Sequence, residues 1–343
     1  MKNKFLRDNL ILAGIALLCV IVPAILIRCY VIDAYAAGII TLAAVNALMA
    51  ISVNVICGIT GQLSLGQAGF QALGAYAVIL LTQNCHIPMV ISVILAGIIA
   101  AFFGFLIGFP TLKLEGDYLA IVTLAFGEII RVCLVNMKGL TGGPNGLQFS
   151  TVFTTSIENG PALAYILIMI TLVAVIWLLQ NFIRSTYGRA ILAVREDPIA
   201  ANSSGISVFK YKMIGFVIAS FIAGIAGALY APLIGFVKPD LASFNNSVNA
   251  LIFVVFGGMG SITGGIIAAF VLTIVQESLR FLGDFRLLTY AIVLILVMLF
   301  RPQGLLGTKE LSFIKAWDNA PSFFKKVGMF FKNLGKKNKK EEK

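Results

Sequence analysis

The sequence predicts an all-α polytopic membrane protein, a bundle of about ten transmembrane helices of which some are short or broken. Three observations support this prediction. Of the 343 residues, 59% are hydrophobic and only 12% are charged, whereas a soluble domain carries about 25% charged residues. The mean hydropathy is +0.97. The apolar residues also form separate runs of the length that crosses a bilayer, about 20 residues for a complete helix.

Ten apolar runs are candidate spans, and the shorter ones suit broken or buried crossings. In chain order they are Leu10–Ile27, Ile32–Ile56, Ala68–Thr82, Pro88–Phe109, Tyr118–Val135, Pro161–Ile183, Met213–Ile234, Val248–Phe256, Gly264–Leu282 and Leu287–Phe300. The first run is long for the apolar part of a signal peptide and suits a span. We interpret it as an uncleaved helix, the alternative being a signal peptide processed near Ala36.

Positive charge predicts which segments face the cytoplasm, because Lys and Arg are enriched in cytoplasmic loops. They gather at the N-terminus, around Arg195 and in residues 308–343, where ten Lys face four acidic residues. All three face the cytoplasm if six spans precede the Arg195 loop and four follow it. That count requires a break within Ser247–Gln276, and the five glycines of Gly257–Gly265 predict one.

Two domains follow from this pattern. Residues 1–307 form the transmembrane domain, and residues 308–343 form a basic cytoplasmic tail, amphipathic to disordered, that can lie on an anionic lipid surface. Because the tail and short loops hold most of the net charge of +11, the charge does not indicate nucleic acid as a partner. Both chain termini are expected in the cytoplasm.

Enzymatic chemistry is not expected of this chain. His86 is the only histidine, and the five cysteines form no close pair, so we predict no metal site and no catalytic residue. The sequence has no phosphate-binding G-x-x-x-x-G-K-[ST] pattern, so we also expect no cofactor bound by this chain.

The segment Gly58–Gly69 is rich in glycine and uncharged polar residues, yet it lies between two apolar runs. Non-helical backbone at membrane depth is tolerated where it is buried in protein or lines a cavity. The segment is therefore a candidate part of a solute pathway, and the alternative is a plain cytoplasmic turn. The candidate pathway residues here are Gly61, Gln62, Ser64, Gly66 and Gln67.

Two further places are pathway candidates. Glu128 and Arg131 lie inside a predicted span, where ionisable groups are costly and usually face the bundle interior. They share a helix face and form either a structural ion pair or a contact for a zwitterionic solute. The turn-rich stretch Leu140–Leu147 is either a plain outer loop or an element that meets an incoming solute, through Thr141, Gly142, Gly143 and Asn145.

The most informative segment is a charged, helix-prone loop of about 28 residues between two apolar runs. Polytopic proteins usually join spans by shorter loops, so this one indicates a docking site for a soluble cytoplasmic partner. Pro198 stands where a short helix would begin.

Small residues recur at every fourth position in two of the apolar runs, at Ala96–Gly108 and at Gly215–Gly227. This spacing predicts close helix packing within the chain or, alternatively, a subunit interface.

The motifs of this chain resemble those of the permeases of branched-chain amino acid ABC importers, and within them the LivM-type subunit. The matching segments are GQLSLGQAGF (61–70), GDYLAIVTLAFGEIIR (116–131), TGGPNGL (141–147), YGRAILAVREDPIAANSSGI (187–206), FGGMGSITGG (256–265) and RPQGLLG (301–307). The pairing of GDYLAIVTL with TGGPNG favours the LivM type over its sister LivH type.

The resemblance implies three kinds of partner besides membrane lipid: a LivH-type permease, two cytoplasmic ABC ATPases that use ATP and Mg, and an extracytoplasmic solute-binding protein. It implies that the charged loop is the coupling segment for the ATPase, through Tyr187, Gly188, Arg189, Arg195, Glu196, Asp197, Ala200, Ala201 and Gly205. The loop departs from the general E-A-A-x-x-x-G pattern, because Ile199 stands at the glutamate position. The tail, residues 308–343, extends beyond the part of the chain that resembles the family core.

The expected function is transport of branched-chain amino acids across the plasma membrane of a prokaryote, by alternating access that the partner ATPases drive. A related permease for urea or amides, another amino acid, a nucleoside or a sugar is the alternative within the class. An ion-coupled secondary carrier is the alternative from another class, with Glu128 and Arg131 serving the ion.

Overall fold

The computed structural model describes residues 20–29, 31–114, 116–149, 160–300, 304, 305 and 307. Most of the first predicted span and the basic tail 308–343 lie outside the described residues. So do Arg301 and Lys309.

Helices account for most of the described chain, as expected of an all-α protein. The long helices are α2 (Ala34–Asn54), α3 (Gln67–Gln83), α4 (Met89–Thr111), α5 (Asp117–Asn136), α8 (Gly160–Arg184), α11 (Val208–Ile234), α12 (Phe244–Gly257), α13 (Ile262–Ser278) and α14 (Arg286–Phe300). Each coincides with one predicted run. Residues 20–28, at the end of the first predicted run, are also helical.

Six helical segments of the described chain are long and apolar enough to cross a membrane, which supports a polytopic membrane protein. In four of them the spanning segment is a single helix, α4, α5, α8 or α11. In the others α2 continues into a π-helix, η1 (Val55–Ile59), and α13 continues into the 3₁₀ helix η4 (Leu279–Phe285). The remaining helices α3, α12 and α14 have 17, 14 and 15 residues. The total of about ten spans stays a prediction.

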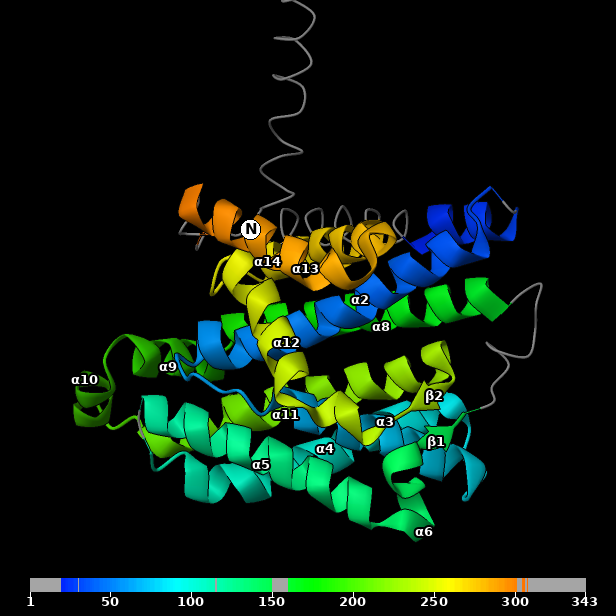
Figure 1. Cartoon of the computed structure of the whole chain (residues 1–343). Helices are drawn as coiled ribbons and strands as arrows, with labels where there is room; N and C mark the ends of the chain where they lie inside the picture. The colour runs from blue at the N-terminus through cyan, green and yellow to red at the C-terminus, as the bar shows by residue number, and fades with distance from the viewer. Residues whose placement is uncertain are drawn as a thin grey trace, which may run out of the picture. The chain divides into compact units, whose positions relative to one another are not determined.

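The helices run between two ends, which Figure 1 shows at its left and right. The short helices α9 (Thr186–Glu196) and α10 (Pro198–Ser203) lie at one end, here called the α9 end. At the other, the β1 end, lie α6 (Lys138–Thr141) and two short strands, β1 (Leu147–Gln148) and β2 (Phe236–Val237). The strands pair antiparallel, Leu147 opposite Val237, a pairing that the sequence did not indicate.

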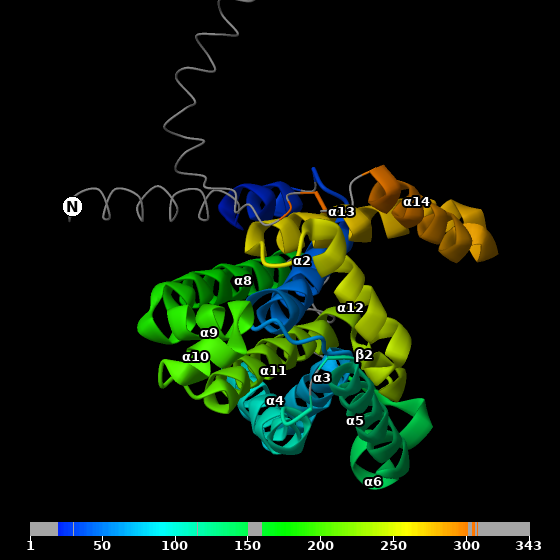
Figure 2. The ribbon, with the colours of Figure 1, turned by 90° about the vertical axis from the view of Figure 1, so that its left-hand side faces the viewer.

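Helix α11 forms the centre of the core and packs against α2, α3 and α4, as the view from the α9 end shows (Figure 2). Small residues make this packing close. A Cβ on Gly227 would lie 1.8 Å from the carbonyl oxygen of Gln71, and one on Gly224 would lie 2.4 Å from the Cβ of Ala100. The predicted close packing is therefore confirmed as contact within the chain.

The predicted break after Gly257 is also confirmed. Helix α12 ends at Gly257 and α13 begins at Ile262. Between them Gly258 and Gly260 have φ values of 107° and 91°, which residues with a side chain rarely adopt. The chain thereby reverses direction, and α12 runs steeply inclined to its neighbours (Figure 1).

Candidate functional site

The polar segment between η1 and α3 is irregular backbone held against its neighbours. At the end of the π-helix, the amides of Thr60 and Gln62 donate to the carbonyl oxygens of Val55 and Ile56, at 3.0 Å each. Residues 61–66 then have no regular structure before α3 begins. A Cβ on Gly66 would lie 2.4 Å from the carbonyl oxygen of Thr123 in α5, so only glycine fits this close approach.

Buried amide and hydroxyl groups gather in this segment. Gln62, Ser64 and Gln67 are 3%, 2% and 1% exposed. Among the described residues, Gln67 Nε2, Ser64 Oγ and both polar atoms of the Gln62 side chain have no hydrogen-bond partner. Burying an unpaired polar group costs about 1–3 kcal/mol. The arrangement therefore offers donors and acceptors to water or to a polar solute.

Two residues that the sequence reading missed belong to the same cluster. Asn54, 1% exposed, has an Nδ2 without a partner among the described residues. The Ser52 hydroxyl lies 3.0 Å from Gln67 Oε1 and 2.8 Å from the Ala219 carbonyl oxygen. The available signal was a polar residue within an otherwise apolar span, which is costly unless it has a role.

A cavity of about 300 Å³ opens beside this segment at the α9 end. Gln62 lines it together with Pro198, the first residue of α10. The other lining residues are Gly61, Leu63, Leu114, Gly116, Asp117, Leu119 and Lys212. The structure thus brings the predicted pathway segment next to the predicted coupling segment, a juxtaposition that their wide separation along the chain did not reveal.

Helix α5 supports the segment from the side. Thr123 Oγ1 accepts a hydrogen bond from the Leu65 amide at 3.2 Å, and a Cβ on Gly127 would lie 3.5 Å from the Cα of Gly66. On α12, Ser247 Oγ accepts from the Ala68 amide at 3.4 Å. Thr123 and Ser247 were not predicted, although both are polar residues beside or within apolar runs.

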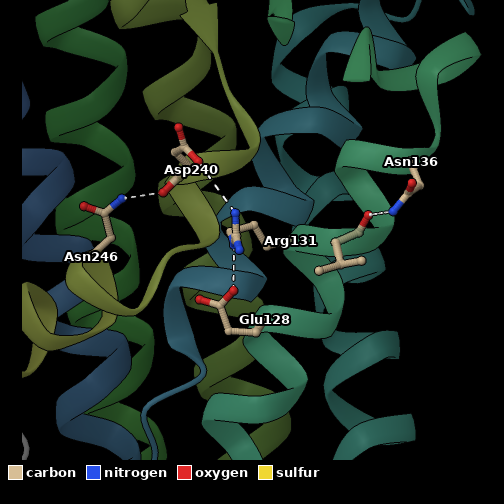
Figure 3. A network of polar contacts seen from close by, with 6 residues as sticks. Glu128, Arg131, Asn136, Asp240 and Asn246 are labelled. Carbon is tan, nitrogen blue, oxygen red and sulfur yellow. Dashed lines mark hydrogen bonds and ion pairs between the residues drawn. The ribbon is translucent and has the colours of Figure 1, made fainter. Parts of the chain in front are cut away.

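Glu128 follows Gly127 on α5 and forms the expected ion pair. Arg131 Nε donates to Glu128 Oε2 at 2.6 Å, and Arg131 Nη1 lies 3.9 Å from an Asp240 carboxylate oxygen. Asn246 of α12 donates to the Asp240 carbonyl oxygen at 3.1 Å. Figure 3 shows this chain of contacts from α5 through the 3₁₀ helix η3 (Pro239–Ala242) to α12. Asn136, bonded to the Val132 carbonyl, lies apart from it.

The charged pair is only partly covered, with 34% of the Arg131 side chain and 37% of the Glu128 side chain exposed. Exposure to lipid would be costly for both charges. The pair therefore suits a face that meets water or another polypeptide. No group of three or more His, Cys, Asp and Glu side chains that could hold a metal ion occurs in the described ranges.

The predicted turn residues Thr141–Asn145 lie at the β1 end, away from Gln62 and the cavity. Thr141 is 2% exposed, and its hydroxyl contacts the carbonyl oxygens of Leu134 and Met137 at 2.5 and 2.9 Å. Gly142 and Gly143 join α6 to the 3₁₀ helix η2 (Gly143–Asn145). Asn145 is exposed. In this structure Thr141 holds the turn together, and Asn145 is free to meet solvent.

The charged loop folds as two short helices. Ser185 Oγ caps α9 by accepting from the Gly188 amide at 3.3 Å. The Asp197 carboxylate caps α10 by accepting from Ile199 and Ala200 at 2.9 and 3.0 Å. Pro198 occupies the first position of α10, where its missing N–H has no cost. The predicted short helix with proline at its start is confirmed.

The predicted coupling residues divide into packed and exposed ones. Ala201 is buried, and a Cβ on Gly188 would lie 2.3 Å from the Ile183 carbonyl oxygen. Gly205 ends the segment with φ 81°. Ile199 and Tyr187 are 79% and 54% exposed. The remaining predicted residues Arg189, Arg195, Glu196, Asp197 and Ala200 are also exposed.

Comparison with known proteins identifies the family. Residues 35–301 match the family described as branched-chain amino acid transport system / permease component. The chain is 37% identical over 293 residues to the high-affinity branched-chain amino acid transport system permease protein LivM of Salmonella typhimurium, covering 78% of this chain and 69% of the relative. It is 35% identical over 325 residues to LivM of Escherichia coli K12, covering 88% and 75%.

A sister protein is more distant. The permease protein LivH of Salmonella typhimurium is 27% identical over 290 residues, covering 79% of this chain and 94% of that protein. No solved structure matches the chain. The higher identity to LivM confirms the resemblance to the LivM type that the motifs predicted. The chain belongs to the family of branched-chain amino acid transport system permease components.

Proposed function

We propose that this chain is a membrane-spanning permease subunit of an ATP-driven importer of branched-chain amino acids in a prokaryotic plasma membrane. The observation that carries the proposal is the identity of 35–37% to LivM permeases over 78–88% of the chain. The chain switches the access of a pathway from one side of the membrane to the other. It performs no covalent chemistry and binds no cofactor.

The proposed complex contains a LivH-type permease, two cytoplasmic ABC ATPases and an extracytoplasmic solute-binding protein. The relatedness to both LivM and LivH supports two homologous permeases side by side. Because the sequence lacks a G-x-x-x-x-G-K-[ST] pattern, ATP and Mg are used by the ATPases. Membrane lipid covers the remaining apolar surface.

We propose that α10 is the coupling helix and contacts the ATPase. It lies at the α9 end with several Lys and Arg residues around it, in agreement with a cytoplasmic location. Ile199 supports an apolar contact, since a 79% exposed isoleucine stands where the general pattern has glutamate. Asp197 caps α10, so its proposed role is to stabilise the start of that helix rather than to contact the ATPase.

The proposed solute pathway passes the buried amides of Gln62 and Gln67 and the charged pair Glu128–Arg131. The unpaired buried polar atoms and the partly exposed ion pair support this, because both can satisfy a zwitterionic solute. The turn with Asn145 is proposed as the outer element that the solute or its binding protein meets.

The proposed topology has ten spans, with both termini and the tail 308–343 in the cytoplasm and residues 1–307 forming the transmembrane domain. The Leu305 amide donates to the Phe256 carbonyl oxygen at 2.8 Å. Residue 305 therefore lies beside the α12–α13 turn, near α9, which supports a tail that leaves from the same side as the coupling segment.

Two alternatives remain. A related permease would use the same coupling with another small solute, such as an amide, another amino acid, a nucleoside or a sugar. An ion-coupled carrier would use Glu128–Arg131 for the ion. The folded, exposed α9–α10 unit favours the ATP-driven importer over the carrier, because a carrier needs no docking element.

The test is uptake of radiolabelled leucine into proteoliposomes that hold this chain, the LivH-type permease and both ATPases, with and without the binding protein. We expect uptake to require ATP and every component. Uptake of a different solute would replace the substrate and keep the mechanism. Uptake by this chain alone, driven by an ion gradient, would establish the carrier.

The coupling helix is tested in the same vesicles with Ile199→Asp. We expect this change to reduce uptake and ATPase binding about tenfold or more, because it places a charge in an apolar contact. Ser207→Asp is the matched control: it adds the same charge to an exposed residue at the N-cap of α11, where aspartate is favoured. Equal effects of both changes would rule out α10 as the docking element.

A further inference from the structure

Three interruptions of helical structure meet at one point of the α9 end. They are the π-helix at the end of α2, the turn between α12 and α13, and the joint between α9 and α10. A Cβ on Gly58 in the π-helix would lie 2.4 Å from the Gly260 amide nitrogen. The Gly260 amide also donates to Asn54 Oδ1 at 2.8 Å. The end of α2 is thus tied to the α12–α13 turn.

Arg195, at the C-terminal end of α9, ties the third interruption to the other two. Its Nη1 donates to the Gly58 carbonyl oxygen at 2.7 Å. A Cβ on Gly61 would lie 2.7 Å from Arg195 Cγ, and one on Gly260 would lie 3.6 Å from Arg195 Nη1. The arginine side chain therefore lies against glycines on both sides, and a side chain at residue 61 would displace it.

The electrostatics of this contact are favourable. The last carbonyl groups of a helix lack intrahelical partners and carry partial negative charge, and a cation is a suitable cap for them. Here the cap comes from another helix 137 residues away. The neighbouring Glu196 accepts from Arg195 Nε at 3.1 Å and also bonds Nη2. The carboxylate thereby holds the guanidinium plane with Nη1 directed at Gly58.

We propose that Arg195 is a positioning residue that transmits movement of the coupling segment to the solute pathway. The inference rests on the proposed function and assigns Arg195 an internal contact in place of one with the ATPase. When α10 moves, Asp197 and Arg195 move with it. The bond to Gly58 then displaces the end of α2 and the start of the segment that carries Gln62 and Ser64. Through Asn54 the same displacement reaches the α12–α13 turn.

The test uses the complete complex with its binding protein, and measures leucine uptake and ATP hydrolysis in the same vesicles. We expect Arg195→Ala to lower the leucine moved per ATP hydrolysed about tenfold, the effect of losing one charge-assisted hydrogen bond. ATP hydrolysis and assembly stay unchanged. Arg195→Lys keeps one hydrogen-bond donor, so the leucine moved per ATP should lie between the values of Arg195→Ala and the wild type.

Arg184→Ala is the matched control. Arg184 is exposed at the end of α8, and its side chain makes no hydrogen bond or ion pair with the described residues. We expect it to leave the uptake per ATP unchanged. The proposal is overturned if Arg195→Ala moves as much leucine per ATP hydrolysed as the wild type. It is also overturned if uptake, ATP hydrolysis and ATPase binding fall together, as a direct contact with the ATPase would require.

Hydrogen exchange separates this proposal from the proposed function. Even if the wild-type complex moves no leucine, the amides of Thr60, Gln62 and Gly260 report on the contact, because all three are bonded around Gly58. We expect these amides to exchange faster in the complex with Arg195→Ala than in the wild type. Arg195→Lys takes its place if the alanine variant does not assemble. Arg184→Ala should leave the exchange unchanged. Unchanged exchange at all three would refute the contact.

Discussion

Polar side chains inside and between the apolar helices distinguish this chain from a simple set of spans. Gln62, Ser64 and Gln67 are buried with unpaired atoms, whereas Glu128 and Arg131 pair with each other. An unpaired charge at the centre of a membrane costs about 2.5–3.5 kcal/mol on insertion scales. The ion pair therefore stabilises α5 in the membrane whether or not a solute uses it.

A double substitution separates these two roles. We expect Arg131→Met to lower both the unfolding temperature and the leucine uptake, because Glu128 is left unpaired. The double variant Glu128→Gln, Arg131→Met removes both charges, so the unfolding temperature should recover. Uptake should stay about tenfold or more below wild type if the pair contacts the zwitterionic solute, since charged hydrogen bonds are worth about 1.5–3 kcal/mol.

The control for this pair is Asp240→Asn. Asp240 is 79% exposed and 3.9 Å from Arg131, and an exposed ion pair contributes about 0–1 kcal/mol. Uptake and unfolding temperature should therefore change little. Recovery of uptake in the double variant would assign the pair a structural role only.

At the scale of the helices, close approach decides which elements form the core. Helix α11 presents small residues on several faces, and α2, α3 and α4 all pack against it. In lipid, such contacts supply much of the attraction between helices, because apolar burial does not distinguish a neighbouring helix from a lipid tail. Replacing one of these small residues should therefore be far more harmful than the same change on an open face.

Two identical substitutions test this. In Gly227→Ala the new Cβ would lie 1.8 Å from the Gln71 carbonyl oxygen, so we expect a loss of about 1–3 kcal/mol of stability or more. In Gly38→Ala on α2 nothing lies within 4 Å of the new Cβ, so we expect a gain of about 0.5–1 kcal/mol from helix propensity. Thermal unfolding in detergent measures both. Similar effects would contradict the assigned packing of α3 on α11.

At the scale of the whole molecule, the two ends of the described bundle differ in character. The α9 end carries the coupling segment, the cavity beside Gln62 and the α12–α13 turn. The β1 end carries the strand pair and the glycine-rich turn. If the basic loops are cytoplasmic, the α9 end faces the cytoplasm and the β1 end faces the outside.

Labelling of single cysteines tests that orientation. Cys85 is exposed just after α3, which ends at the β1 end, so we expect a membrane-impermeant maleimide to label it from outside intact cells. The other four cysteines are replaced by alanine. In a chain without Cys85, Ser203→Cys on α10 should be labelled only after the membrane is opened. The reverse pattern would invert the proposed topology.

Local patterns in the sequence predicted most of the helices correctly. Nine apolar runs coincide with helices, because length and hydropathy are properties of each run alone. The glycines after Gly257 predicted the turn for the same local reason, and Pro198 predicted the start of α10. The motifs also predicted the family, which the match over residues 35–301 confirms.

The contacts between distant segments depend on the tertiary structure. Neither the bond from Arg195 to Gly58 nor the position of Pro198 beside Gln62 follows from any local pattern, since each joins residues more than 130 positions apart. The roles of Asn54 and Asp240 likewise depend on their neighbours. In this chain the sequence by itself determined which segments are helices and which family they belong to. Packing of those helices decided which polar groups meet, because a side chain's partners depend on the fold around it.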